Sequence, residues 1–331
     1  MIRRLVTVTG SAGLVGSGSR YRGLVDFGLR YAMVGVLVVL AIVADILSPG
    51  FFELQNLQNI LTQNAPVGLV AAGMTFVIIC GGFDLSVAAI LAVGSVLFAS
   101  FSGSMPIPIA AVATVGVGLL AGAFNGFIVT RLKVNAFVAT LGTASIFSGL
   151  AFIFSNSEPV FQERSGFDFL GSGEILGIPV SIYILVGVFL IAGLVLARTT
   201  YGRSVYSIGG NTEAARLCGL RVDLIRASTY LLTGALAALG GMLIASQTGV
   251  GQAEIASSVT LDSIAIVIIG GTSLIGGEGA MWRTAVGLLI LATINNVFDA
   301  LALDVAPQSV VKGAIIVIAV SLDSYTRRRV G

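Results

Sequence analysis

The residues best suited to contact a small solute lie in a short break between two apolar runs, Gly81-Gly82-Phe83-Asp84-Leu85-Ser86. Two adjacent glycines interrupt the helical pattern, and non-helical backbone at membrane depth is tolerated only where it is buried in protein or lines water. A carboxylate at such a break is a candidate functional group. Asp84 could equally cap the following helix. Both roles stay open, and one residue can serve both.

Other polar residues lie within or beside apolar runs, namely Asn125, Thr272, Ser273 and Asn295. Together with Phe83 and Asp84, they are our candidates for a translocation path. Glycine at every fourth position across residues 118–126 predicts that the helix carrying Asn125 packs closely on another helix. Amides inside lipid usually bond across helices, so a structural role is the alternative for each asparagine.

The chain lacks the residues that other kinds of chemistry require. It has no histidine, and its two lysines, Lys133 and Lys312, follow Leu and Val, whereas a phosphate-binding P-loop needs Gly-Lys-Ser/Thr. The two cysteines, Cys80 and Cys218, fit neither a disulfide framework nor a metal site. We therefore expect no catalytic residue, no metal and no cofactor. Any ATP hydrolysis would belong to another subunit.

A polar stretch of a different kind spans residues 198–226. Asn211 or Thr212 can cap a short helix there, with Glu213 in its first turn. Gly219 suits the left-handed residue that ends a helix. The stretch therefore predicts a short, capped surface helix.

One face of this predicted helix is small and apolar. Ala214, Leu217 and Cys218 fall on it at spacings of three and four residues. Such a face on a surface helix suits insertion into a groove of a partner. An ordinary cytoplasmic connector is the alternative interpretation.

Membrane-spanning helices must position these segments. Of the 331 residues, 56% are hydrophobic and 10% charged, and the mean hydropathy is +1.01, whereas soluble domains carry about 25% charged residues. We expect an all-α integral membrane protein, because ten apolar runs are long enough to cross about 30 Å of hydrocarbon. The expected spans are roughly 31–47, 59–80, 86–102, 107–130, 135–154, 180–197, 228–248, 259–275, 281–298 and 307–323.

The basic residues fall on one side of this arrangement. With the N-terminus inside, 16 of the 18 lie in inner segments, while Arg164 lies outside and Lys312 lies in the last span. Cytoplasmic loops are enriched in Lys and Arg. The pattern therefore predicts an even number of spans, with both termini in the cytoplasm.

An internal similarity links the two halves of the chain. IICGGFDLS at 78–86 aligns with VIIGGTSLI at 267–275, an offset of 189, and each is later followed by an Asn motif, Asn125-Gly126 or Asn295-Asn296. Two five-span halves must insert in opposite orientations, because five is odd. This construction is typical of transport proteins with a path at the repeat interface. We therefore expect two five-span inverted repeats.

Five stretches resemble, in order, the motifs of a known family. They are GGFDLSV at 81–87, NGFIVTRLKVNAFVATLG at 125–142, YGRSVYSIGGNTEAARLCGL at 201–220, LDSIAIVIIGGTSLIGGEG at 261–279 and VVKGAIIVIAVSLD at 310–323. The chain resembles the membrane permease subunits of bacterial ATP-binding-cassette (ABC) importers, in the ribose/xylose-type branch of the branched-chain amino acid and sugar permease family. The resemblance covers nearly all of residues 30–325.

This resemblance implies partners and a mechanism. Two permease copies would form a dimer, each docking an ABC ATPase subunit, and an extracytoplasmic sugar-binding protein would deliver the solute. The chain would lie among lipids of the bacterial inner membrane and bind no nucleic acid. The coupling residues by resemblance are Glu213, Ala214, Ala215 and Gly219, which match the importers' Glu-Ala-Ala and following Gly. ATP-driven movement of this coupling helix would switch the permease between outward and inward access.

The resemblance also implies the organisation of the chain and leaves its substrate partly open. We expect a cytoplasmic N-terminal tail at 1–30, a permease domain at 31–326 (first half 31–197, cytoplasmic coupling loop 198–227, second half 228–326) and a basic cytoplasmic tail at 327–331. The Gly-Gly-x-Asp-Leu-Ser form favours a sugar over an amino acid. Asn135-Ala136 and Ala88-Ala89 depart from the Pro-Pro and Gly-Ser common in the family. The alternatives are an ion-coupled secondary transporter and an ABC permease for a branched-chain amino acid or another small polar solute.

Overall fold

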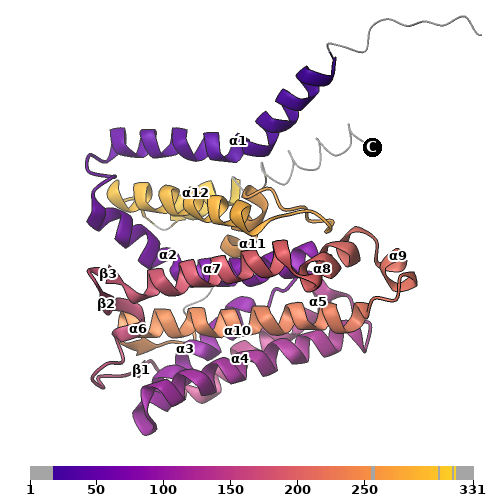
Figure 1. Ribbon diagram of the computed structural model, residues 1–331. Coiled ribbons are helices and arrows are strands. Elements are labelled where there is room, and N and C mark those ends of the chain that lie inside the picture. Colours follow the sequence, from indigo (N-terminus) through magenta and orange to yellow (C-terminus); the bar gives the residue numbers. More distant parts are fainter. Residues whose placement is uncertain (1–17, 255–257, 305, 315–316, 318–331) are drawn as a thin grey trace, which may run out of the picture.

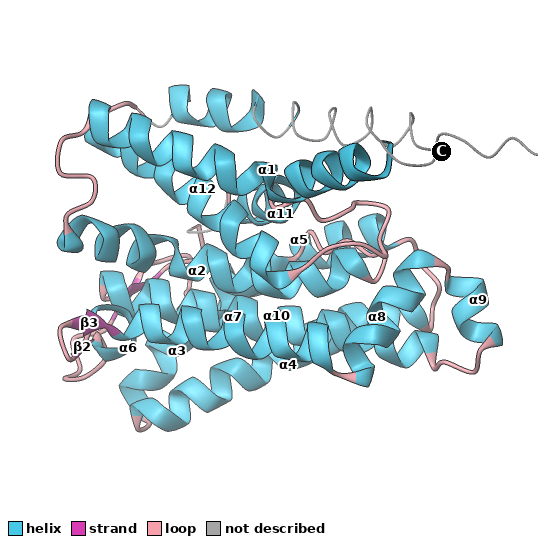
Figure 2. Ribbon diagram, turned by 45° about the horizontal axis from the view of Figure 1, so that its top comes forward, coloured by secondary structure: helices cyan, strands magenta, loops and turns pink. Residues whose placement is uncertain are grey.

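The computed structural model describes residues 18–254, 258–304, 306–314 and 317, in which the chain is mainly helical (Figures 1 and 2). The helices are α1 (Gly18–Leu47), α2 (Leu54–Ile79), α3 (Val87–Ser104), α4 (Ile107–Thr130), α5 (Ala136–Phe154), α6 (Phe169–Ser172), α7 (Val180–Arg198), α8 (Thr200–Gly210), α9 (Thr212–Leu217), α10 (Val222–Thr248), α11 (Val259–Ile269) and α12 (Met281–Ala300). The strands are β1 (Val160–Phe161), β2 (Glu174–Ile175), β3 (Ile178–Pro179) and β4 (Val250–Gly251). β1 pairs antiparallel with β4, and β2 with β3.

Seven of the described helices are long and apolar enough to cross a membrane, namely α2, α3, α4, α5, α7, α10 and α12. Residues 32–47 of α1 and the helix α11 are shorter apolar helices. The first nine expected spans each overlap a helix, although α11 ends at Ile269, six residues before the expected end of its span. The tenth begins as helix at residues 306–314. Residues 1–17 of the expected N-terminal tail, most of the rest of the tenth span and the basic tail at 327–331 lie outside the described residues.

The long helices run side by side between two ends of the molecule (Figure 1). One end, which we call the hairpin end, carries α6 and the short strands, and the other, the α9 end, carries α8 and α9. Three basic residues from the expected inner segments, Lys133, Arg216 and Arg226, bond to groups at the α9 end. The α9 end is therefore the one that the arginine pattern assigns to the cytoplasm.

Arg164, the basic residue expected on the other side, has a structural role at the hairpin end. Its Nη1 donates to the carbonyl oxygens of Ser102 and Met105, at 2.9 and 2.8 Å. These carbonyls belong to the last turn of α3 and the residue that follows it, where no intrahelical donor remains. Arg164 therefore caps α3 at this end.

α10 lies at the centre and contacts α2, α3 and α4. The predicted close packing of residues 118–126 is confirmed, and α10 is the partner. A Cβ added at Gly122 would overlap the carbonyl oxygen of Tyr230, and one added at Gly126 would lie 2.9 Å from the carbonyl oxygen of Ala227. The small residues let the two backbones approach directly.

A proline inside α2 is accommodated by the same central helix. Pro66 has no N–H, so the carbonyl of Thr62 loses its usual intrahelical partner. The side-chain amide of Gln247 on α10 donates to that carbonyl at 2.9 Å. A buried helix can therefore carry this proline without leaving its carbonyl unpaired.

The directions of α2, α11 and α12 correct the proposed pairing of the two glycine motifs. α12 runs antiparallel to α2, because Thr284 near its start bonds Thr75 late in α2 at 2.8 Å, and Asn296 near its end bonds Asn56 early in α2 at 2.9 Å. α11 folds back along α12, where a Cβ on Gly287 would overlap the carbonyl oxygen of Ile266. α11 is therefore parallel to α2. Two helices related by an inverted repeat would end on opposite sides of the membrane, so the assignment of these two motifs as an inverted pair is wrong.

The two motifs nevertheless share one local structure, in a register one residue away from the expected alignment. α2 ends with left-handed Gly81 (φ 77°) and α11 with left-handed Gly271 (φ 85°). Gly82 N–H bonds the carbonyl of Val77, as Thr272 N–H bonds that of Val267. The equivalent of Gly81 is thus Gly271, where the sequence alignment paired it with Gly270. Both turns are helix-ending Schellman motifs.

The expected correspondence between the asparagine motifs is also wrong. Asn125 lies on α4, the second helix after the first glycine turn, whereas Asn295 lies on α12, the first helix after the second turn. They also bond differently, Asn125 to Ser86 and Asn295 to Asn64 of α2. Similar residue types in two apolar helices produced the apparent match.

Candidate functional site

The break between α2 and α3 is held by a fully buried polar cluster. Ser86 donates to Asp84 Oδ1 through both its backbone N–H, at 3.0 Å, and its hydroxyl, at 2.6 Å. Asn125 on α4 donates to the Ser86 hydroxyl oxygen at 2.7 Å. Asp84, Ser86 and Asn125 are all 0% exposed. The geometry of Asp84 is that of a group that stabilises the turn into α3, and its contact with a solute stays a prediction.

Two further helices clamp the backbone on either side of Asp84. The hydroxyl of Tyr230 on α10 donates to the carbonyl of Phe83 at 3.2 Å. The N–H of Leu85 donates to the hydroxyl of Thr140 on α5 at 3.0 Å. The break is therefore connected directly to α4, α5 and α10. Movement of any of these helices would change the path of residues 81–86.

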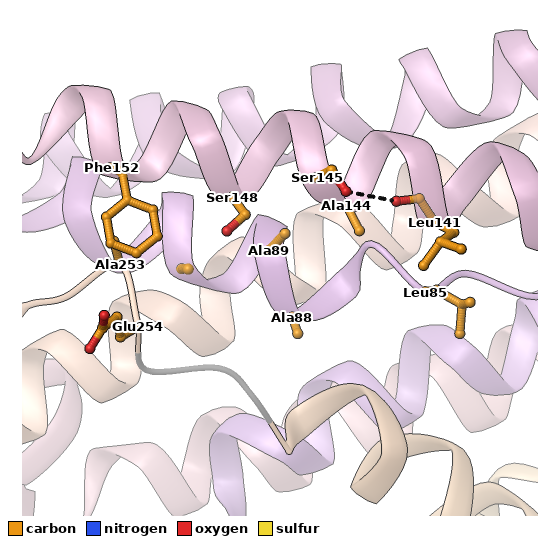
Figure 3. Close-up of a pocket in the computed structure, with 11 residues that line it drawn as sticks. Leu85, Ala88, Ala89, Leu141, Ala144, Ser145, Ser148, Phe152, Ala253 and Glu254 are labelled. Carbon is orange, nitrogen blue, oxygen red and sulfur yellow. Dashed lines mark hydrogen bonds between the residues drawn. The ribbon is translucent and has the colours of Figure 1, made fainter. Parts of the chain in front are cut away.

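The break separates two crevices. On one side, a crevice of about 810 Å³ opens between α3 and α5; we call it the hairpin-side crevice (Figure 3). Its lining residues are Leu85, Ala88, Ala89, Ala92, Leu141, Ala144, Ser145, Ser148, Phe152, Ala253 and Glu254. Figure 3 shows Ser148 and Phe152 of α5 along one wall, with Leu85 and Glu254 at opposite ends of the crevice. This crevice is of the size that binds small molecules.

On the other side of the break lies a crevice of about 550 Å³, which we call the α9-side crevice. Its lining residues are Gly81, Gly82, Phe83, Val129, Lys133, Val134, Asn135, Ala136, Phe137, Arg226 and Tyr230. α5 passes along both crevices, because the residues around its start line one and residues 141–152 line the other. Phe83 and Leu85 thus face different crevices although only Asp84 lies between them.

The other polar residues expected in the path lie away from both crevices. Thr272 and Ser273 are 2% and 0% exposed in the loop between α11 and α12. Asn295 donates to the side chain of Asn64 on α2 at 3.3 Å. Among the candidates, only Asp84 and Asn125 are brought together, and Phe83 is the one that lines a crevice.

Sequence reasoning missed the residues of α5 that line the hairpin-side crevice. Ser145, Ser148 and Phe152 follow one another at spacings of three and four, which places them on one face of the helix. That stripe of hydroxyls and one ring in an apolar span was the available signal. Glu254, in the segment after β4, gave no such signal.

The short helix α9 has the caps that the sequence predicted. Asn211, one of the two candidate caps, accepts from the N–H of Ala214 at 2.9 Å. Gly219 has φ 84°, and the N–H of Leu220 bonds the carbonyl of Ala215, which closes the C-terminal turn. These local bonds allow a helix of six residues to form at the surface.

The two faces of α9 have different surroundings. Ala215 is 4% exposed and packs with Val205, Ile208 and Val222. Ala214, Leu217 and Cys218 are exposed, as are Glu213 and Gly219, and Leu217 reaches 88% exposure. The expected apolar face is therefore free in this chain, while Ala215 attaches the helix to the rest of the protein.

Polar contacts also hold α9 against its neighbours. Arg226 on α10 donates to the hydroxyl of Thr212 at 3.0 Å. Asp223 on α10 pairs with Arg216 of α9 at 3.6 Å and with Lys133 before α5 at 2.9 Å. These ion pairs are exposed, so each contributes little stability, and together they mainly orient α9.

Comparison with known proteins gives one family. The family described as branched-chain amino acid transport system, permease component, matches residues 56–320. The ribose import permease protein RbsC of Bacillus subtilis is 42% identical over 291 residues, covering 87% of this chain and 90% of that protein. RbsC of Escherichia coli K12 is 37% identical over 93% of this chain and 97% of that protein. The L-arabinose transport system permease protein AraH of Escherichia coli K12 is 37% identical over 90% of this chain and 92% of that protein. No solved structure gives a significant match.

Proposed function

The chain belongs to the family of permease components of branched-chain amino acid transport systems, and we propose that it is the membrane subunit of an ABC importer that brings a monosaccharide of the ribose or xylose kind into the cytoplasm. The observation that carries this proposal is the similarity to permeases named for ribose and L-arabinose over 87–93% of this chain. The chain is a multi-pass protein of the bacterial inner membrane. It supplies the path, and partner subunits supply the ATP hydrolysis.

The proposed path uses the two crevices in turn. A sugar would enter the hairpin-side crevice, where the hydroxyls of Ser145 and Ser148 can bond its hydroxyl groups and the ring of Phe152 offers an apolar face. It would leave through the α9-side crevice past Phe83. Alternating access then requires the break to open first on one side and then on the other.

The remaining candidate path residues are proposed to hold this break and its surroundings. Asp84 and Asn125 fix the turn into α3, and Asn295 ties α12 to α2. Thr272 and Ser273 lie in the loop that packs on the end of α2, where the Ser273 hydroxyl accepts from the N–H of Ile275 at 3.2 Å. Their substitution would disturb the path through its backbone.

The proposed coupling helix is α9. It would enter a groove of the ABC ATPase subunit with its exposed residues Glu213, Ala214 and Gly219. Leu217 would supply the largest apolar side chain of this contact. Ala215 would serve the same coupling from the opposite face, by fixing α9 to α8 and α10. An extracytoplasmic sugar-binding protein would dock at the hairpin end.

The finer architecture follows from the family and from the arginine pattern. We propose ten spans in two five-span inverted repeats, both termini in the cytoplasm, and a homodimer of permeases. α1 and α7, the first and sixth of the ten proposed spans and therefore the first span of each five-span repeat, run in opposite directions, which supports this proposal (Figure 1). The helix at residues 306–314 would begin the tenth span.

The test is a pull-down from detergent-solubilised membranes, followed by uptake in proteoliposomes that contain the ATPase and the binding protein. We expect the parent chain to retain the ATPase subunit and to take up labelled ribose or xylose only with ATP. Glu213→Arg should release the ATPase, whereas Glu174→Arg, an exposed glutamate at the hairpin end, should not. No ATPase retained by the parent, or equal retention by Glu213→Arg, would refute the coupling-helix assignment. Uptake that persists without ATPase and collapses with the proton gradient would identify an ion-coupled carrier.

A further inference from the structure

Three glycine-containing segments, far apart in the sequence, meet at the α9 end. They are Gly81 after α2, Gly209 and Gly210 at the end of α8, and the glycines at 276–277 in the loop between α11 and α12. We call this meeting point the glycine junction. It lies directly before α9 and directly before the break, because α9 begins two residues after Gly210 and Gly81 begins the break.

The contacts at the glycine junction are between backbones. The N–H of Gly277 donates to the carbonyl of Ile79, the last residue of α2, at 2.8 Å. A Cβ added at Gly209 would overlap that same carbonyl oxygen and would lie 2.6 Å from the Gly277 nitrogen. A Cβ added at Gly276 would lie 2.9 Å from the Cα of Gly81. No flexible side chain separates α8 from the end of α2 at this point.

A side chain of α8 adds a second connection to the loop between α11 and α12. The hydroxyl of Tyr206 donates to the carbonyl of Gly279 at 2.8 Å. Burial raises the pKa of the Tyr206 hydroxyl above its ordinary value, so the group stays protonated at physiological pH and keeps its proton for this bond. α8 is therefore fixed both to the end of α2 and to the loop.

We propose that Gly209 is a positioning residue that transmits movement of α9 to the break after α2. The inference rests on the proposed function, in which the ATPase moves α9. Because α8 joins α9 across Asn211 alone and touches α2 backbone to backbone, α8 must carry Ile79 with it or break the junction. Ile79 is the last residue of α2, just before the segment that divides the two crevices. Its displacement would therefore change the directions in which the side chains of Phe83 and Leu85 point.

The chain offers a matched pair of variants for the test. A methyl group at Gly209 meets backbone atoms and forces α8 from α2 by roughly 1 Å or more. A methyl group at Gly210, the next residue of the same helix, meets nothing within 4 Å. Neither glycine has a positive φ, so helix propensity affects both substitutions alike.

The experiment measures sugar moved per ATP hydrolysed, in proteoliposomes with the complete importer. We expect Gly209→Ala to retain the ATPase subunit and to lower this ratio by about tenfold or more, and Gly210→Ala to match the parent. A merely structural role would lower the amount of folded complex and leave the ratio unchanged. A Gly209→Ala complex with the parental ratio would overturn the proposal.

A second variant decides the matter if Gly209→Ala does not fold. Tyr206→Phe removes one hydroxyl and the bond to Gly279 without adding an atom, and we expect it to lower the ratio by about three- to tenfold. A parental ratio in Tyr206→Phe would then overturn the proposal. These results are distinct from a failure of the proposed function, in which the parent importer itself would show no ATP-driven uptake.

Discussion

Truncating Leu217 to alanine should weaken binding of the ATPase subunit without lowering the stability of the permease. Leu217 is 88% exposed on α9, so the free chain loses almost no packing when the side chain is shortened. If the ATPase buries this side chain, the change removes about 2 kcal/mol of apolar transfer free energy, which raises Kd roughly thirtyfold. Such values are typical of a residue near the centre of an interface.

The assay is titration of the purified ATPase subunit onto the permease in lipid nanodiscs, with thermal unfolding of each variant in parallel. Leu176→Ala is the matched control, because Leu176 is 95% exposed in the turn between β2 and β3 at the opposite end of the molecule. We expect an unchanged melting temperature for both variants and an altered Kd for Leu217→Ala alone. An unaltered Kd for Leu217→Ala, or the same loss for Leu176→Ala, would refute the argument from the exposed face of α9.

Two further predictions concern the break and the hairpin-side crevice. Ser86→Ala removes both hydroxyl contacts that join Asp84 to Asn125 and leaves buried polar atoms unpaired. We therefore expect a loss of about 2–4 kcal/mol in unfolding free energy, measured by thermal or denaturant unfolding in detergent. Parental stability would mean that Asp84 finds another donor. Ser148→Trp should fill the crevice and lower sugar uptake at least about tenfold while the ATPase subunit is retained. Ile146 lies on the same helix, is 52% exposed and does not line the crevice, so Ile146→Trp should transport normally. Equal losses in the two tryptophan variants would argue against a path through this crevice.

Several features of the fold could be predicted because they depend on neighbouring residues. Hydropathy located nine helices, since an apolar run of sufficient length needs no distant partner to be recognised. Asn211 and Gly219 marked the ends of α9 because capping bonds reach only three or four residues. The glycines at 118–126 predicted close helix packing but could not name α10 as the partner.

The site was predicted less completely because its residues are assembled from distant segments. Asp84 and Asn125 were singled out for their types, yet only the tertiary structure joins them through Ser86 and turns them away from both crevices. Asn295 has an equally suggestive type and proves to be part of the contact between α12 and α2.

The sequence by itself determined that this chain is a helical membrane protein, where its long apolar helices lie and how α9 is capped, because each of these depends on local composition and short-range hydrogen bonds. Only the tertiary structure decided that α11 runs parallel to α2, that α5 lines two crevices and that Gly209 touches the end of α2. These features depend on which faces of distant helices meet. In a chain that is apolar throughout, many pairings bury similar surfaces, and close backbone contacts select among them.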